Sequence, residues 1–214
     1  MRKKRVRLKT PPRAVYTSYV GKNDSLIQEV AQLYLPAGCR VADITYGKGV
    51  FWKFLDMDEY EFYPSDLVTV PERPYDFTEK LPYDAESFDV VVFDPPYTHN
   101  PGDMIVNDSY QLKETTTGFY HKDIIELYRK GMTQAFRILK PGGTLWVKCK
   151  DEIESSRQYM SHIEIHDIAT KELSLKVKDL FVLTQRNRPV VQFEDQQHAR
   201  KNHSYLWIFL KPEN

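Results

Sequence analysis

The sequence predicts a doubly wound α/β fold built on a mainly parallel sheet. Strand and helix signals alternate along most of the 214 residues. The β-branched and aromatic run 89–93 is typical of a central parallel strand that is buried on both faces. Because the chain is long enough for one sizeable core but short for two, we expect one domain over residues 14–214.

Helix and strand signals alternate through the first half of the chain. Ser25 and Gln28 form a capping box before an apolar stripe that stops at a proline, which predicts a helix. Strands are expected next at 40–45 and 61–66, with a helix starting at 50–55 between them. This order leads into the central strand described above.

The second half repeats the alternation. An apolar stripe over about 124–139 predicts a long helix that ends at the Pro-Gly-Gly turn 141–143, before a strand at 144–149. The remaining signals predict a helix near 155–173 and strands near 178–184 and 204–210. Strand, helix and strand in this order indicate parallel neighbours in one sheet.

Two segments stand apart from this pattern. Residues 1–13 hold seven basic side chains and no acid, so the rest of the chain carries 23 basic against 30 acidic groups, although the whole chain has a net charge of +0. We expect this arm to be flexible. Residues 98–119 have no clear period and exceed an ordinary connection, which favours a lid or target-contacting loop.

Composition excludes several classes of protein. Purely apolar runs such as 90–93 and 206–210 are far too short to cross a bilayer, and no apolar segment of a signal peptide follows the basic start. Cys39 and Cys149 form no CxxC pair, so a disulfide framework and a zinc ribbon are not indicated. His162 and His166 share a helical spacing but have no third ligand. We therefore expect a soluble protein of a reducing compartment, without a metal or a membrane partner.

A glycine turn follows the first predicted strand. Gly47 and Gly49 permit a tight turn and close approach of a ligand to backbone N–H groups, although many ordinary strand-to-helix turns look the same. Asp66 lies 23 residues after Asp43, a spacing at which a carboxylate can accept hydrogen bonds from ribose hydroxyls. Because the turn lacks the third glycine and no Walker A loop is present, a nucleoside cofactor without phosphate is favoured.

The most specific motif is Asp94-Pro95-Pro96-Tyr97, at the end of the central strand. Consecutive prolines remove two N–H donors and extend the backbone, so the Asp94 carboxylate and the Pro95 carbonyl can converge as acceptors on one NH₂ group. The Tyr97 ring offers a face on which a base can stack. The alternative is a strand end capped by a rigid turn.

These motifs together resemble the class I S-adenosylmethionine-dependent amino methyltransferases, especially the DNA N6-adenine and N4-cytosine group. The resemblance implies a seven-stranded Rossmann-like sheet, S-adenosylmethionine as cofactor and catalysis by residues 94–97. The cofactor motif precedes the catalytic motif, as in the gamma arrangement. The residues that the resemblance places at the cofactor are Asp43, Thr45, Tyr46, Gly47, Gly49, Asp66, Asp76 and Phe77, with Tyr16 and Thr17 in the place of the N-terminal cofactor motif.

For Asp76 and Phe77 the residues leave two interpretations open. They can meet an adenine edge and face, or form a solvated turn acid beside a core phenylalanine. The resemblance also implies a cytoplasmic protein of prokaryotic or phage origin, such as the methyltransferase of a restriction-modification system. A homodimer or a partner subunit remains open.

Asp at the first position of the tetrapeptide leans toward adenine N6 in DNA by family analogy. The alternatives are transfer to cytosine N4, transfer to a base amine in RNA, and a non-catalytic nucleic-acid-binding subunit of a methyltransferase heteromer. An acidic body needs basic segments to dock a polyanion. The side chains expected to contact phosphate are Arg2, Lys3, Lys4, Arg5, Arg186, Arg188, Arg200 and Lys201.

Overall fold

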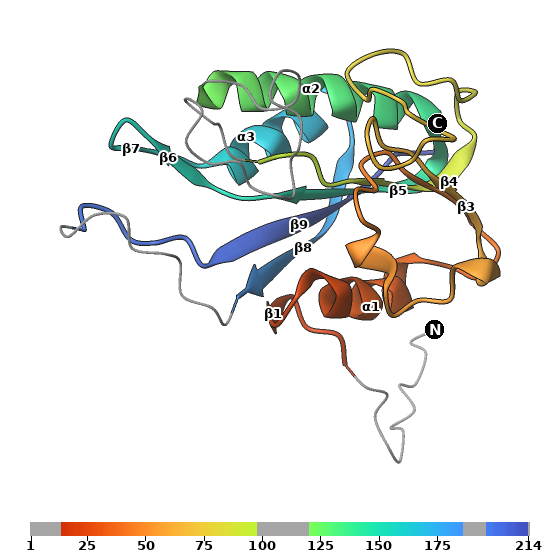
Figure 1. Ribbon diagram of the computed structural model, residues 1–214, viewed down its shortest axis with the longest axis horizontal. Coiled ribbons are helices and arrows are strands. Elements are labelled where there is room, and N and C mark those ends of the chain that lie inside the picture. Colours follow the sequence, from red (N-terminus) through yellow and green to blue (C-terminus); the bar gives the residue numbers. More distant parts are fainter. Residues whose placement is uncertain (1–13, 98–119, 186–195, 214) are drawn as a thin grey trace, which may run out of the picture.

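The computed structural model describes residues 14–97, 120–185 and 196–213. Its centre is a seven-stranded sheet (Figure 1). The strands are Ser18–Val20 (β1), Arg40–Asp43 (β2), Glu61–Pro64 (β3), Phe88–Phe93 (β4), Leu139–Cys149 (β5), Lys176–Thr184 (β8) and His203–Leu210 (β9). Their order across the sheet is β1-β8-β9-β5-β4-β2-β3.

The sheet is mainly parallel, as the sequence predicts. Strands β3, β2, β4 and β5 run parallel to one another, and β1 runs parallel to β8. Only β9 is antiparallel, and it pairs with both β5 and β8. The carboxyl ends of β2, β3, β4 and β5 therefore meet at one edge of the sheet, which we call the carboxyl edge.

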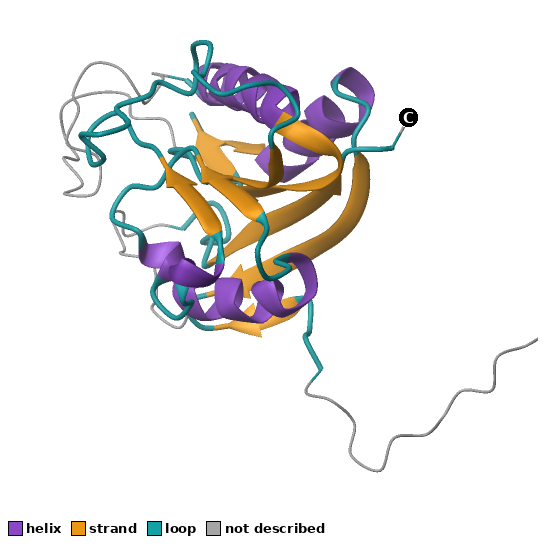
Figure 2. Cartoon of the chain, turned by 90° about the vertical axis from the view of Figure 1, so that its right-hand side faces the viewer, coloured by secondary structure: helices purple, strands orange, loops and turns teal. Residues whose placement is uncertain are grey.

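Helices cover both faces of the sheet (Figure 2). Helix α1 (Asn23–Tyr34) packs on one face, while α2 (His121–Ile138) and α3 (Ser161–Asp167) pack on the other. A π-helical turn, Ile168–Glu172, extends α3. This is the Rossmann-like arrangement expected for the fold class.

Strand β4 is buried on both faces because its alternate side chains enter different cores. Val91 and Phe93 lie in the core under α2, whereas Val90 and Val92 lie in the core under α1. A continuous apolar run is the signature of such a strand. The residues that follow β4 are thereby held at the centre of the carboxyl edge.

Two predicted helix starts are wrong. Helix α1 begins at Asn23, before the predicted capping box, and Asp24 rather than Gln28 pairs with Ser25. The predicted helix at 50–55 is a 3₁₀ turn, Val50–Trp52, followed by a second one, Met57–Glu59. The Trp52 side chain is buried and its indole N–H donates to Asp43, which holds this short turn against the end of β2.

The structure also contains three strands that the sequence did not predict, and one helix boundary differs. A hairpin of β6 (Glu152–Glu154) and β7 (Arg157–Tyr159) occupies the start of the helix predicted near 155–173. The edge strand β1 was not expected, and α2 ends at Ile138, ahead of the Pro-Gly-Gly turn. The basic arm 1–13 and the predicted lid 98–119 lie outside the described residues.

Within residues 14–97, 120–185 and 196–213, none of the helices has the length and apolar character needed to span a membrane.

Gly131 lets α2 lie close to β4, and this contact gives a first prediction. A Cβ at position 131 would stand 2.2 Å from Cζ of Phe93, a fully buried ring. Gly131→Ala should lower the free energy of unfolding in urea by about 1–3 kcal/mol, because overpacking outweighs the gain of about 1 kcal/mol in helix propensity. Lys130→Ala, at an exposed position of the same helix, serves as the control. A stabilised Gly131→Ala variant would show that the contact is not tight.

Candidate active site

Three of the predicted site acids meet at the carboxyl edge. Asp43 is the last residue of β2, Asp66 follows β3, and Asp94 follows β4. The three strands are neighbours, in the order β4-β2-β3. The charges of Asp94 and Asp66 both act on Asp43, so the three carboxylates share one electrostatic environment.

A hydrogen bond joins the predicted cofactor motif to the predicted catalytic motif. The backbone N–H of Asp94 donates to Oγ1 of Thr45, with 2.6 Å between the nitrogen and the oxygen. Beside it, the N–H of Ile44 donates to the carbonyl of Val92. The loop after β2 and the tetrapeptide after β4 are therefore held against each other.

Asp66 organises the glycine turn. Its Oδ2 accepts a hydrogen bond from the N–H of Gly47 at 3.1 Å, and its Oδ1 accepts from the N–H groups of Val68 and Thr69. Gly47 has φ +54, and an added Cβ would meet only the Thr45 carbonyl oxygen, at 4.0 Å. A carboxylate has about four acceptor positions, so Asp66 retains one for a ligand hydroxyl, and the space beside Gly47 is open. These features fit a nucleoside cofactor.

Asp43 lies deeper than the sequence suggests. Its side chain is buried, and its two oxygens accept hydrogen bonds from the Thr45 N–H at 3.0 Å and the Trp52 indole N–H at 2.7 Å. Burial raises the pKa of Asp43 to about 7, although both hydrogen bonds oppose this. The carboxylate is thus engaged in holding the loop and the following 3₁₀ turn.

Asp76 and Phe77 are half-buried and make contacts within the protein. Oδ1 of Asp76 accepts from the N–H and the hydroxyl of Thr78, which closes a local turn. The Phe77 ring packs edge-on against Phe93, with 5.1 Å between ring centroids. A turn acid beside a core ring is what these contacts describe.

Tyr16 and Thr17 are not brought to the other candidates. Thr17 precedes β1, and its carbonyl accepts a hydrogen bond from the Val182 N–H of β8 at 2.7 Å. Tyr16 is 72% exposed. Strand β1 is the edge strand next to β8, so β8, β9, β5 and β4 separate it from β2.

The tetrapeptide places an unpaired acceptor at the centre of the site. Oδ1 of Asp94 is buried and has no hydrogen-bond partner in the described part of the chain. Burial raises the pKa of Asp94 to about 6, and the positive charge of Lys148 opposes that rise. A buried acceptor without a partner costs free energy, so its presence indicates a donor that arrives with a ligand.

From the sequence alone, Lys148 and Lys150 are equally well interpreted as phosphate contacts or as a solvated strand end, whereas the structure buries Lys148. It lies in β5, is 1% exposed, and donates a hydrogen bond to the hydroxyl of Ser204. Its Nζ stands 5.9 Å from the centroid of the Tyr97 ring. The signal available in the sequence is that this lysine interrupts an otherwise mainly apolar strand, 144–149, whose side chains are expected to be buried.

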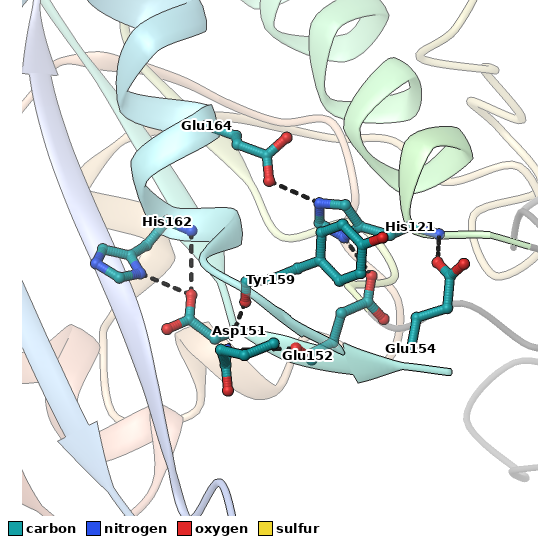
Figure 3. Close-up of polar contacts among 8 residues, drawn as sticks. His121, Asp151, Glu152, Glu154, Tyr159, His162 and Glu164 are labelled. Atoms are coloured by element: carbon teal, nitrogen blue, oxygen red, sulfur yellow. Dashed lines mark hydrogen bonds and ion pairs between the residues drawn. The ribbon is translucent and has the colours of Figure 1, made fainter. Parts of the chain in front are cut away.

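A polar network fixes the start of α2 beside this edge (Figure 3). The two ring nitrogens of His121 bind Glu152 at 2.6 Å and Glu164 at 2.7 Å, and the ring stacks on Tyr159. Burial disfavours the charged imidazole, but the two carboxylates raise the pKa of His121. Glu154 accepts from the His121 N–H at the amino end of α2. The network ties the β6–β7 hairpin and α3 to α2.

The histidine pair of α3 is engaged within the protein. His162 binds Asp151 at 2.6 Å and stacks on Tyr205, while His166 contacts Asp167. Across the described ranges no group of three or more His, Cys, Asp or Glu side chains is arranged to hold a metal ion.

Some of the predicted phosphate contacts lie at the same edge. Arg200 and Lys201 immediately precede β9, whose amino end pairs with the carboxyl end of β5. The charge of Lys201 acts on Lys150, and burial together with that charge lowers the pKa of Lys150. The remaining predicted contacts lie outside the described residues, and they are Arg2, Lys3, Lys4, Arg5, Arg186 and Arg188.

Solved structures share this fold. An S-adenosylmethionine-dependent methyltransferase from Methanosarcina mazei aligns with a TM-score of 0.54 at 12% identity, over 86% of this chain and 98% of that one. TrmN from Thermus thermophilus aligns with a TM-score of 0.52 at 14% identity, over 88% of this chain and 48% of that one. The cytosine-N4-specific PvuII DNA methyltransferase has a TM-score of 0.47 at 12% identity, over 61% of this chain and 44% of that one. The chain spans about half the length of the last two.

The fold is therefore that of an S-adenosylmethionine-dependent methyltransferase. Residues 88–214, more than half of the chain, match the N6/N4 family described as DNA methylase, and the chain belongs to that family. The matched segment includes the tetrapeptide and Lys148. A comparison with curated protein sequences gives no match.

The hydrogen bond between Asp94 and Thr45 gives a second prediction. Thr45→Val keeps the shape of the side chain but removes the acceptor, which leaves the Asp94 N–H unpaired. The free energy of unfolding in urea should fall by about 1–3 kcal/mol. Thr45→Ser retains the hydroxyl and should stay within about 1 kcal/mol of the wild type. Equal stability of Thr45→Val and the wild type would mean that the bond does not couple the two loops.

Proposed function

We propose that this chain transfers the methyl group of S-adenosylmethionine to the exocyclic N6 of adenine in DNA. The observation that carries the proposal is the Asp94-Pro95-Pro96-Tyr97 tetrapeptide at the carboxyl end of β4, hydrogen-bonded through Thr45 to the glycine turn. Membership of the DNA methylase family supports DNA as the substrate. Asp at the first position favours adenine over cytosine by analogy with the family.

The residues that we propose to bind the cofactor lie at the carboxyl edge. Asp66 uses its remaining acceptor position for a ribose hydroxyl, and the open side of Gly47 admits the nucleoside. Asp43 acts indirectly, because it holds the loop through Thr45 and Trp52. S-adenosylmethionine supplies an electrophilic methyl group on a sulfonium, and this chemistry needs no protein nucleophile.

The chain's part in the reaction is to prepare the amine. An exocyclic amine conjugated with its ring is a poor nucleophile, so its lone pair must leave conjugation. The Asp94 carboxylate accepts one of its N–H bonds and the Pro95 carbonyl accepts the other. The amine nitrogen would then supply the electron pair of the new N–C bond to the methyl group that bound S-adenosylmethionine provides. The electron pair of the broken S–C bond would stay on the sulfur of the cofactor, and the amine proton would pass to solvent. Positioning of this kind contributes about 7–11 kcal/mol.

The protonation state of Asp94 suits this role. With a pKa of about 6, the group is mainly a carboxylate at neutral pH and becomes a neutral acid as the pH falls below that value. Methyl transfer should therefore be lost as the pH falls below about 6.

The target base must leave the duplex stack, and the Tyr97 ring offers a stacking face worth about 1–3 kcal/mol.

DNA docks at the carboxyl edge in this proposal. Residues 54–96 hold 12 acids against two basic side chains, so the backbone of DNA avoids the β3 side. Lys150, Arg200 and Lys201 lie at the opposite part of the same edge, beyond β5 and β9. The basic arm and the residues around Arg186 add further phosphate contacts.

A methyl-transfer assay tests the proposal. Tritiated methyl transfer from S-adenosylmethionine is measured on unmethylated genomic DNA and on total RNA, followed by nucleoside mass analysis. We expect N6-methyladenine in DNA, its loss by at least about 100-fold in Asp94→Ala, and a smaller loss of about 5–100-fold in Tyr97→Ala. Asp84→Ala removes an exposed acid and is the matched control.

Each other outcome identifies an alternative. N4-methylcytosine would keep the reaction and replace the base, and label found only in RNA would replace the nucleic acid. Absence of label in both, together with absence of S-adenosylmethionine binding, would favour a non-catalytic nucleic-acid-binding subunit.

A further inference from the structure

Lys148 is a buried cation whose partners do not account for its charge. The side chain is 1% exposed, and an ammonium removed from water carries a desolvation penalty of several kcal/mol. It has three N–H donors. Within the described ranges the only acceptor of a hydrogen bond from Nζ is the neutral hydroxyl of Ser204. A full countercharge is therefore missing from its immediate contacts.

The complementary group stands on the neighbouring strand. Asp94 follows β4, which pairs with β5 in a register that places Phe93 opposite Val147, so Asp94 lies next to Lys148 along the ladder. Oδ1 of Asp94 is buried without a hydrogen-bond partner among the described residues. The two unlike charges act on each other, and each stabilises the charged form of the other. They form a buried pair without a direct ion bridge.

The titratable groups around Asp94 and Lys148 add negative charge beside the Asp94 carboxylate and one like charge beside Lys148. Asp43 on β2 repels the Asp94 carboxylate, and Asp66 adds a second negative charge to the same edge. Cys149, next along β5, is a neutral thiol because burial raises its pKa. Lys150 carries a like charge that opposes the charge of Lys148. Lys148 is therefore the cation whose charge acts directly on the Asp94 carboxylate.

The same ammonium also faces the last residue of the tetrapeptide. Its Nζ lies 5.9 Å from the Tyr97 ring centroid, within the range of a cation–π contact. One buried ammonium thus acts on both ends of the segment 94–97, on the Asp94 carboxylate through its charge and on the Tyr97 ring through a cation–π contact.

We propose that Lys148 is a positioning residue of the site, whose buried ammonium compensates the charge of the Asp94 carboxylate and fixes the Tyr97 ring beside it. The inference rests on the proposed function, since it assigns to Asp94 and Tyr97 the orientation of the target base. Lys148 itself does not touch the base. It acts through the two residues that do.

The test measures the ionisation of Asp94 directly and needs no substrate. Aspartate side-chain carboxyls are labelled with ¹³C, and the Asp94 signal is identified by its absence in Asp94→Asn. In the wild type the signal should titrate near pH 6. In Lys148→Met the midpoint should rise by about 1–3 pH units, because an opposite charge nearby depresses the pKa of a carboxyl by that amount. Lys148→Arg should preserve the wild-type midpoint.

The control and a second measurement keep the inference open to refutation. Lys176→Met removes an exposed charge at the amino end of β8 and should leave the midpoint unchanged. If Lys148→Met does not fold, the reciprocal titration decides, because Asp94→Asn must lower the pKa of ¹³C-labelled Lys148 by a similar amount. An unmoved Asp94 midpoint in folded Lys148→Met, or an unmoved Lys148 pKa in Asp94→Asn, would overturn the inference.

The methyl-transfer assay separates this inference from the proposed function. If the wild type transfers methyl groups, the acid limb of its pH profile should move to higher pH in Lys148→Met, while the KM for S-adenosylmethionine stays the same. A wild type without transfer would refute the proposed function and leave the titration result intact. A merely structural role for Lys148 would lower stability without moving the acid limb.

Discussion

The hydrogen bond from the Asp94 amide to the Thr45 hydroxyl is the contact on which the site depends. Parallel strands end at the carboxyl edge with backbone groups that no further strand can pair, so side chains must complete the hydrogen bonding there. Thr45 does this between β2 and β4, and Asp66 does it between β3 and Gly47. Three separate strand ends thereby become one surface. A cofactor and a target base can meet only where such ends are joined.

The carboxyl edge brings the buried acids Asp43 and Asp94 close together, away from water. Burial raises the pKa of Asp43 and Asp94, so neutralising partners must lie close to them. Lys148 provides a positive charge from inside the sheet, whereas Trp52 provides a neutral donor from the 3₁₀ turn. The acid-rich β3 side and the basic residues near β9 then give the edge an uneven charge distribution, which in the proposed function orients DNA across it.

The sequence was sufficient where local pattern and physical role coincide. The run 89–93 predicted a central strand because burial on both faces demands continuous apolar residues, and Asp94-Pro95-Pro96-Tyr97 predicted a strand end because proline cannot continue the ladder. It failed where tertiary contacts decide. The hairpin 152–159 depends on Glu152 reaching His121, and the depth of Asp43 depends on Trp52. For Lys148 the sequence left a phosphate contact and a solvated strand end open, because its partners Ser204 and Tyr97 are distant in sequence.

We propose that the carboxyl edge of β2, β3 and β4 is the cofactor site, and calorimetric titration of S-adenosylmethionine tests this proposal most directly. Binding heat is predicted for the wild type and for Asp94→Asn, and an affinity at least about 10-fold weaker for Asp66→Ala, since a charged hydrogen bond is worth about 1.5–3 kcal/mol. Asp58→Ala removes an exposed acid and should bind like the wild type. Unchanged affinity in a folded Asp66→Ala variant, or no heat with the wild type, would contradict the account.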